Sequence, residues 1–284
     1  MLKRILVVLS ASEFTPAAVR MAAEMADVET EVEHERVTLV GLSVVDTDLM
    51  PSGRFSSLVP REELLSEAQA KAEEVITEFR ALTKTLGVRE NLIETSCVSG
   101  SPFREVIRKG VFCDLIVMGR KSSFPPVYHD YETMPNLFHR ASRPVLIVGD
   151  THRPLERVIL AMDGTAPSSR VMYHYVHLNP FPKAKLLVIY SKGEEEQYHL
   201  TEYFRNVESY LKSFHLDVEM KRLDGEVRNE IVEVVKKEDA QVIAMGIHSE
   251  HFLDRFGEAL HINLREDTIE KILRTTSACL FTVH

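Results

Sequence analysis

The sequence of 284 residues lacks the long apolar stretches that a membrane protein needs. No run approaches the roughly 18 apolar residues of a membrane-spanning helix. The apolar run near the start, Ile5 to Leu9, has five residues, which is too short for the core of a secretory signal. We therefore expect a chain without a membrane segment or a leader peptide.

Basic clusters and cysteine motifs are also missing. Residues 1–150 contain 17 basic and 22 acidic residues and residues 151–284 contain 17 and 21, so the formal charges are −5 and −4. Nucleic-acid binding needs Lys and Arg to neutralise phosphates, so we expect a small molecule or a protein as partner. The three cysteines, Cys97, Cys113 and Cys279, show no C-x-x-C spacing, which fits the cytoplasm and small buried residues on or beside strands.

Signatures of common enzyme classes are not found either. The sequence has no G-x-S-x-G, no G-x-x-x-x-G-K-S/T, and no G-x-G-x-x-G after its first strand-like segment. We therefore expect a protein that is not an enzyme, with weak ATP hydrolysis left open.

What the sequence does contain is a repeat. The segment Arg4–Ser12 recurs as Arg157–Thr165 at an offset of 153, and Asp114–Gly119 later recurs as Gln241–Gly246. Such self-similarity indicates a duplicated structural unit. We predict two domains, residues 1–150 and 151–284, because each half is long enough to bury its own core.

Each half alternates short apolar runs with segments of helical periodicity, which predicts an α/β fold with a parallel sheet covered on both faces. The long helix predicted over residues 61–86 is stopped by Gly87, and Ser101 precedes another helix that starts at Pro102. Residues 46–60 form a long irregular connection, typical of a lid or binding loop. The predicted strands are residues 3–9, 37–45, 92–98, 114–118 and 144–148, then 157–162, 185–190, 217–223, 241–245 and 279–283.

These motifs resemble the universal stress protein family in its tandem form. The strand followed by Asp163-Gly164-Thr165-Ala166-Pro167-Ser168 is similar to the family's D-G-S-x-x-S, and Met118-Gly119 and Met245-Gly246 match the end of its fourth strand. The resemblance implies two doubly wound five-stranded sheets of order 3-2-1-4-5, packed as a pseudo-dimer through their fifth strands. In nucleotide-binding members, an aspartate after strand one contacts adenine, and G-x-x-G, nine residues and G-S/T follow strand four.

The sequence departs from this nucleotide-binding pattern in both halves. Ser10 replaces the aspartate in the first half, and the second glycine after strand four is missing from both. The expected G-S pair falls on Tyr131-Glu132 and Glu266-Asp267. Because glycines let the backbone approach phosphates, the resemblance implies weak ATP binding or none. The candidate binding residues are Asp163, Gly164, Thr165, Ser168 and Gly246 in the second half, and Ser10, Ser12, Gly119, Arg120, Lys121, Ser122 and Ser123 in the first.

Several candidates also have a purely structural interpretation. Asp163 either contacts adenine or caps the following helix. Residues 120–123 either hold a phosphate or form a solvated loop. His248 and His251, in the longer segment 247–265, either bind a metal or lie on an exposed helix.

The sequence thus predicts a stress-response or regulatory binding protein with little or no catalysis. One alternative is an ATP-binding or AMP-binding stress protein with weak hydrolysis through the second half. Another is a protein-interaction scaffold without a ligand. A further homodimer is compatible with each.

Overall fold

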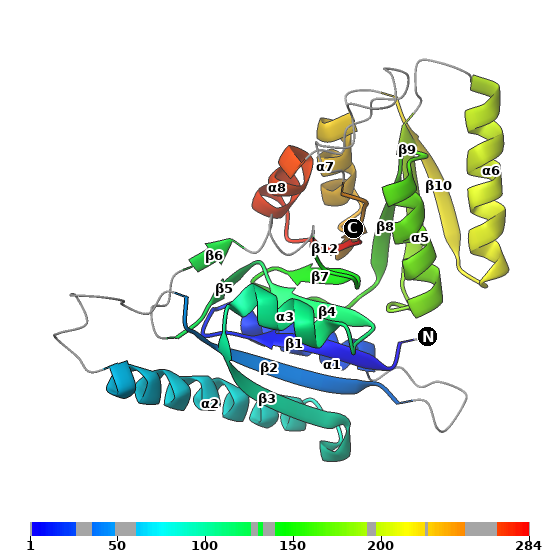
Figure 1. Ribbon diagram of the computed structural model, residues 1–284. Coiled ribbons are helices and arrows are strands. Elements are labelled where there is room, and N and C mark those ends of the chain that lie inside the picture. The colour runs from blue at the N-terminus through cyan, green and yellow to red at the C-terminus, as the bar shows by residue number, and fades with distance from the viewer. Residues whose placement is uncertain are drawn as a thin grey trace. The chain divides into compact units, whose positions relative to one another are not determined.

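The computed structural model describes residues 2–26, 36–48, 61–125, 130–132, 140–191, 197–224, 227–247 and 266–283. The chain divides into two compact units, Leu2–His152 and Arg153–His284, named here the first and the second unit. Each unit contains a parallel sheet with helices beside it (Figure 1).

The first unit has five parallel strands in the order β3-β2-β1-β4-β7. This is the predicted order 3-2-1-4-5. The side chains of the two central strands are almost wholly buried and apolar, because a central parallel strand is covered on both faces. The strands are β1 (Arg4–Leu9), β2 (Thr38–Asp46), β3 (Ile93–Gly100), β4 (Leu115–Gly119) and β7 (Val145–Val148).

Among the described residues of this unit, the helices are α1 (Thr15–Ala26), α2 (Arg61–Thr85) and α3 (Pro102–Gly110), with a short 3-10 turn η2 (Glu90–Leu92) before β3. The predicted end of α2 is confirmed. Gly87 has a φ of 80°, and the Val88 N–H donates to the Thr83 carbonyl at 3.0 Å, which closes the helix as expected for glycine in this position. Ser101 precedes α3 as predicted, but its side chain makes no capping hydrogen bond.

Two short strands of the first unit were not predicted from the sequence. Strands β5 (Lys121–Ser123) and β6 (Asp130–Glu132) pair in antiparallel fashion directly after β4. The interpretation of residues 120–123 as a solvated loop is therefore wrong, because three of these residues form a strand and Ser122 and Ser123 are buried.

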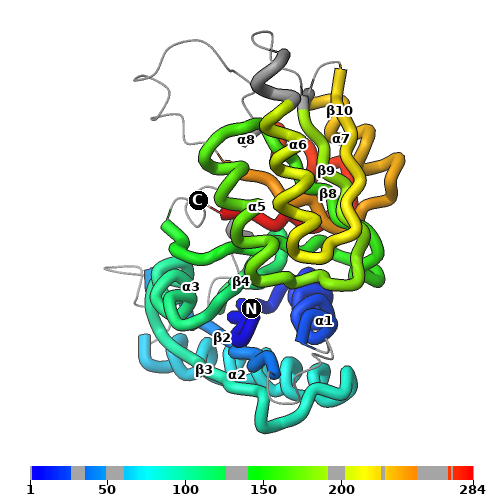
Figure 2. The backbone as a smooth tube through the Cα atoms, turned by 90° about the vertical axis from the view of Figure 1, so that its right-hand side faces the viewer, coloured from blue at the N-terminus to red at the C-terminus, as the bar shows by residue number. Residues whose placement is uncertain are grey.

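The second unit repeats the parallel sheet in the order β10-β9-β8-β11-β12. Helices α5 and α6 cover the same face of this sheet (Figure 2). In the aromatic-rich helix α6 (Gln197–Ser213), Phe204, Val207 and Leu211 are buried. The elements are β8 (Arg157–Met162), α5 (Ala166–Leu178), β9 (Lys185–Ser191), α6 (Gln197–Ser213), β10 (Val218–Leu223), α7 (Val227–Lys237), β11 (Val242–Ala244), α8 (Glu266–Thr275) and β12 (Cys279–Thr282).

Two further expectations, on membrane-spanning helices and on the cysteines, can be compared with the described residues. None of the helices in this part of the chain combines the length and the apolar character needed to cross a bilayer. The three cysteines lie on or next to strands, Cys97 half-buried and Cys113 and Cys279 buried, and all are free thiols. Burial raises the pKa of the Cys97 and Cys113 thiols, which makes both less reactive.

Candidate functional site

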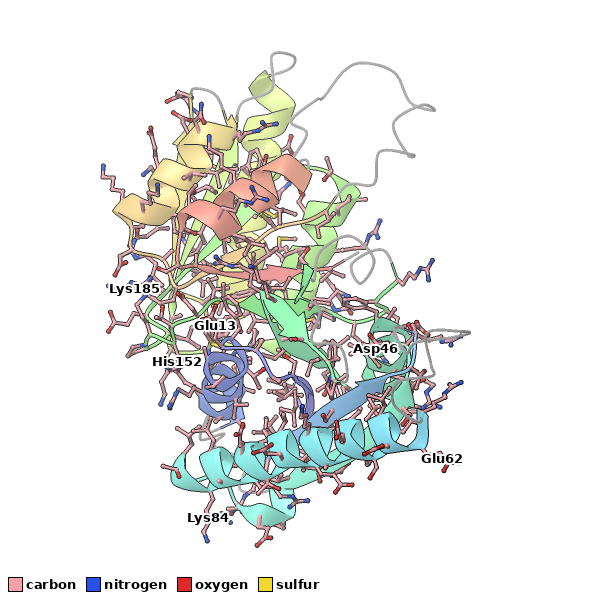
Figure 3. The ribbon with its side chains drawn as sticks, turned by 90° about the vertical axis from the view of Figure 1, so that its left-hand side faces the viewer. Glu13, Asp46, Glu62, Lys84, His152 and Lys185 are labelled. Atoms are coloured by element: carbon pink, nitrogen blue, oxygen red, sulfur yellow. The ribbon has the colours of Figure 1, made fainter. Side chains whose placement is uncertain are left out.

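The candidate residues lie at the carboxyl ends of the parallel strands, the edge at which open α/β sheets bind ligands. In the first unit this edge carries Ser10 after β1, Asp46 at the end of β2 and Gly119 at the end of β4. Figure 3 shows Asp46 on the side of the unit where Glu62 lies, in the first turn of α2, whereas Lys84 lies near the far end of that helix. Asp163 and Gly246 occupy the corresponding edge of the second unit.

Ser10 forms a closed hydrogen-bonded turn with Thr15. The Thr15 hydroxyl donates to the Ser10 carbonyl at 2.8 Å and lies 3.1 Å from the Ser10 hydroxyl. Both side chains are buried. The position at which nucleotide-binding relatives carry an aspartate is therefore occupied by a neutral group that bonds within its own turn.

The segment Lys121–Pro125, named here the strap, runs across the carboxyl ends of β1 and β2. The Ala11 N–H donates to the Ser123 carbonyl at 3.0 Å, and the Asp46 N–H donates to the Pro125 carbonyl at 2.7 Å. The Ser12 hydroxyl donates to the Lys121 carbonyl at 2.8 Å. Backbone donors that could otherwise face a ligand at this edge are thus bonded to the chain itself.

Burial shows how closely the strap is packed. Ser122, Ser123 and Phe124 are 1%, 5% and 1% exposed. Phe124 is among the largest fully buried side chains described. Asp46, predicted only as the start of the connection 46–60, is completely buried beside the strap, and its Oδ1 accepts from the Asp48 N–H at 2.9 Å.

Of the other first-unit candidates, Gly119 has a packing role. A Cβ there would lie 2.5 Å from the Phe14 Cβ and 3.1 Å from the Lys121 carbonyl oxygen. The backbone N–H of Arg120 donates to the Val148 carbonyl at 2.9 Å. The structure brings Ser12 and Lys121 together through the Lys121 carbonyl of the strap.

Gly246 has the same role in the second unit. A Cβ there would lie 2.6 Å from the Pro167 carbonyl carbon and 2.7 Å from the Ser168 nitrogen. Gly246, two residues after β11, therefore contacts the first turn of α5 backbone to backbone, which only glycine permits.

Asp163 forms the turn that starts α5. Its Oδ1 accepts from the Thr165 N–H at 2.9 Å and from the Thr165 hydroxyl at 2.5 Å, while Gly164 takes a φ of 80°. Thr165 is the N-cap of α5 and its Oγ1 accepts from the Ser168 N–H at 3.5 Å. Asp163, Thr165 and Ser168 therefore come together in one turn, and their hydrogen bonds are those of a helix cap.

An aromatic cluster lies near this turn. Tyr190, whose strand position pairs with Met162, stacks on Phe204 with ring centroids 4.0 Å apart. Tyr203 contacts the edge of Phe204, and its hydroxyl lies 3.3 Å from the Ser169 hydroxyl. Tyr190 is not among the predicted site residues, although its place near the end of the unit's second strand, β9, is a signal present in the sequence.

Several predicted positions fall outside the described residues or have undescribed side chains. His248, His251 and the segment 248–265 lie outside them, and Glu132, Glu266 and Asp267 are placed only as members of β6 and α8. Within the described part of the chain, no three His, Cys, Asp or Glu side chains gather as a metal site.

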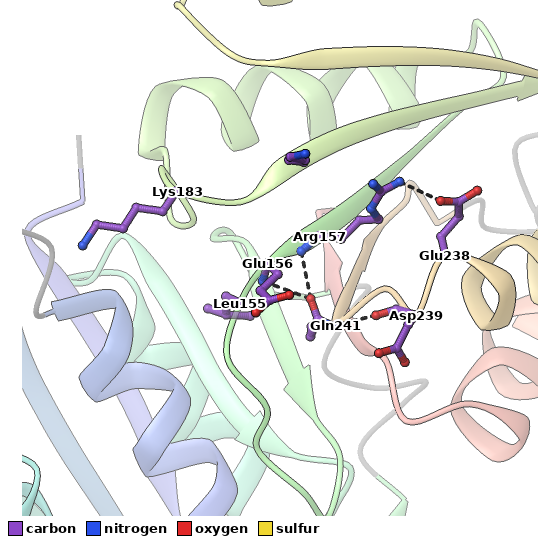
Figure 4. A pocket seen from close by; sticks show the side chains of 8 residues that line it. Leu155, Glu156, Arg157, Lys183, Glu238, Asp239 and Gln241 are labelled. Atoms are coloured by element: carbon purple, nitrogen blue, oxygen red, sulfur yellow. Dashed lines mark hydrogen bonds and ion pairs between the residues drawn. The ribbon is translucent and has the colours of Figure 1, made fainter.

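A charged cavity of about 500 Å³ lies at the opposite, amino-terminal edge of the second unit (Figure 4). Gln241 Oε1 accepts from the backbone N–H groups of Glu156 and Arg157 at 3.0 and 2.8 Å. Arg157 pairs with Glu238 at 2.6 Å. The cavity is lined by Leu155, Glu156, Arg157, Lys183, Lys185, Glu238, Asp239 and Gln241.

The first unit has the same arrangement at its amino-terminal edge. Asp114 Oδ2 accepts from the N–H groups of Lys3 and Arg4, both at 2.8 Å. Arg4 binds Glu94 through two hydrogen bonds of 2.9 and 2.7 Å, and these bonds hold the pKa of Glu94 below its ordinary value. In both units, one side-chain oxygen thus accepts from two successive backbone N–H groups at the start of the unit's first strand.

Comparison with known proteins supports the same fold. The chain is similar to a universal stress protein from Archaeoglobus fulgidus DSM 4304, with a TM-score of 0.71 and 18% identity over 99% of this chain and 97% of the other. A functionally unknown protein, PA1789, from Pseudomonas aeruginosa PAO1 gives a TM-score of 0.52 and 16% identity over 99% and 92%. At these identities the likeness establishes the fold alone. No curated protein sequence matches the chain significantly.

The family model of the universal stress protein family matches residues 1–149. This match covers more than half of the chain and includes the first strand, the strap and the closing strand β7. Together with the repeated sheet of the second unit, it accounts for the motifs noted in the sequence. The chain therefore belongs to the universal stress protein family.

Proposed function

We propose that this protein is a stress-response binding protein that acts by regulatory binding without catalysis and does not hold ATP as nucleotide-binding relatives do. The strap is the observation that carries the proposal. It occupies the carboxyl edge of β1 and β2 in the first unit, bonds the N–H groups of Ala11 and Asp46, and buries Phe124 there. A nucleotide at this edge would have to displace a packed part of the chain.

Charge supports the proposal in the second unit. Helix α8 begins with Glu266 and Asp267, at the position where the family pattern has a G-S/T pair. A phosphate charge within about 5 Å of either carboxylate would cost on the order of 3 kcal/mol at an effective dielectric near 20. One N–H contact to a charged partner returns roughly 1.5 to 3 kcal/mol, so repulsion outweighs a single contact.

Isothermal titration of ATP with magnesium tests the proposal. Magnesium is included because a cation bridging carboxylate and phosphate reverses the sign of their interaction. We expect weak or absent heat of binding for the wild type and partial recovery for a variant with Glu266→Gly and Asp267→Ser. Micromolar binding by the wild type would contradict the proposal.

A second candidate function is ATP or AMP binding through the second unit. It is favoured by the retained Asp163 and by the stacked Tyr190 and Phe204 near the same turn. Native mass spectrometry of freshly purified protein separates the candidates. A retained nucleotide supports this second function, another small ligand supports regulatory binding, and a chain without ligand supports a protein-interaction scaffold.

A further inference from the structure

Strand β3 is an exposed edge of the first unit's sheet. Its eight residues pair with β2 on one side, and no strand pairs with its other side in the part of the chain that the structure describes. Every residue of β3 is at least partly exposed, whereas β7, at the other end of this sheet, is buried along its whole length.

The direction of the free backbone groups follows from one hydrogen bond. The Thr47 N–H donates to the Gly100 carbonyl at 3.2 Å, so the backbone groups of Gly100 face β2. Because successive residues of a strand direct these groups to alternate sides, Thr95, Cys97 and Ser99 direct theirs away from β2. The N–H of Ile93, on the same outward side, bonds back to Glu90, which agrees with this assignment.

This edge lacks the features that usually prevent strand pairing. Exposed edges are commonly protected by charged residues, especially lysine, or by proline. Strand β10, at the edge of the second unit's sheet, carries Glu219, Lys221 and Arg222. Strand β3 carries one charge, Glu94, and Arg4 binds it.

We propose that two copies of this chain pair in antiparallel fashion along β3, with Cys97 opposite Cys97 of the second copy. This register places Thr95 opposite Ser99 of the second copy, so every outward backbone group described above finds a partner. About six hydrogen bonds form, two for each hydrogen-bonded pair. Glu94 lies opposite Gly100 of the second copy, so no like charges face each other, and the contact is self-complementary as a two-fold interface requires.

Ser99 offers a charge test of this register. It is exposed, and in the proposed pair it lies opposite Thr95 of the second copy, whose hydroxyl accepts from Arg80 Nη2 at 2.7 Å. Ser99→Lys therefore places a positive charge near that arginine, and Ser99→Glu places a negative one. Each change occurs twice in the dimer. We therefore expect Ser99→Lys to raise the dissociation constant of the dimer about fivefold and Ser99→Glu to lower it by a similar factor.

The expected order of the two dissociation constants is the reverse of the order that the net charge of the chain alone would give. The chain has a formal charge of −9, so Ser99→Lys would reduce overall repulsion between copies and Ser99→Glu would increase it. Exposed Ser209 on α6 provides the matched control, because Ser209→Lys and Ser209→Glu change the net charge equally at a remote position. Sedimentation velocity of the full chain over a concentration series measures all five proteins.

Cross-linking gives a second measurement. Cα atoms of a hydrogen-bonded antiparallel pair lie about 5.5 Å apart, within the range that a disulfide spans. Mild oxidation at alkaline pH should therefore produce a covalent dimer in wild type and none in Cys97→Ser. A chain that stays monomeric at every concentration overturns the proposal, as does a dimer that neither Ser99 change affects or that does not cross-link through Cys97.

Discussion

Asp163 shows how one carboxylate shapes the second unit. Its Oδ1 accepts two hydrogen bonds from Thr165 while the side chain is only 6% exposed. We predict that Asp163→Ala lowers the free energy of unfolding by about 1 to 2 kcal/mol, because it removes the acceptor of the partly buried Thr165 N–H. Asp163→Asn, which keeps an oxygen at this position, should cost less than half as much. Urea unfolding measures both, and equal losses would argue against the capping role.

If the second unit binds an adenine ligand, Asp163→Ala should also weaken that binding, by about 1 to 3 kcal/mol. Ser10→Ala should change it little, since the Ser10 hydroxyl bonds to Thr15. Titration of both variants with AMP tests this difference. Equal effects of the two substitutions would show that the difference between Asp163 and Ser10 does not decide which unit binds adenine.

Glu94 makes a pH-dependent contribution to stability. Its hydrogen bonds to Arg4 lower its pKa from 4.5, so the unfolded chain takes up this proton more readily than the folded chain. The stabilisation is complete above pH 4.5 and is lost as the pH falls through the lowered pKa. We predict that Glu94→Gln costs less than about 1 kcal/mol at pH 7, because the pair is exposed, and that this cost shrinks as the pH falls below 4.5. Thermal unfolding of both proteins checks this, and a cost that persists in acid would contradict it.

The strap is a short segment whose stability depends on one side chain. We predict that Phe124→Ala lowers the free energy of unfolding by about 3 to 5 kcal/mol, because it leaves a cavity in a closely packed region. Phe112→Ala is the matched control, since Phe112 is 72% exposed, and it should change stability by less than about 0.5 kcal/mol. Similar losses in the two variants, measured by chemical unfolding, would show that Phe124 does not hold the strap in place.

The parallel strands were predictable because their signal is local and repeated. Apolar runs such as Ile5 to Leu9 and Leu115 to Met118 fix the central strands within one or two residues. The Asp-Gly-Thr turn likewise contains its own hydrogen-bonding partners. The strap was not predictable, because Lys121, Ser122 and Ser123 are polar. The bonds that hold the strap join the Ser123 and Pro125 carbonyls to the N–H groups of Ala11 and Asp46, far away in sequence.

The pairing of the two units stays a prediction. Strands β7 and β12 end their respective sheets, and both are buried along their whole length. An uncovered strand edge invites pairing with another chain, so we expect residues 1–150 expressed alone to dimerise or precipitate. Size-exclusion chromatography with light scattering tests this. A soluble, stable monomer of that fragment would refute the prediction.

The strap has a consequence for stoichiometry. A chain with two equivalent open edges would take up two ligands, and binding to one unit could influence binding to the other. With the edge of the first unit bonded to residues 121–125, we expect a ligand of the carboxyl edge to bind once per chain, with a hyperbolic saturation curve and a Hill coefficient of about one. Duplication would then have given this protein one binding edge and one permanently closed edge.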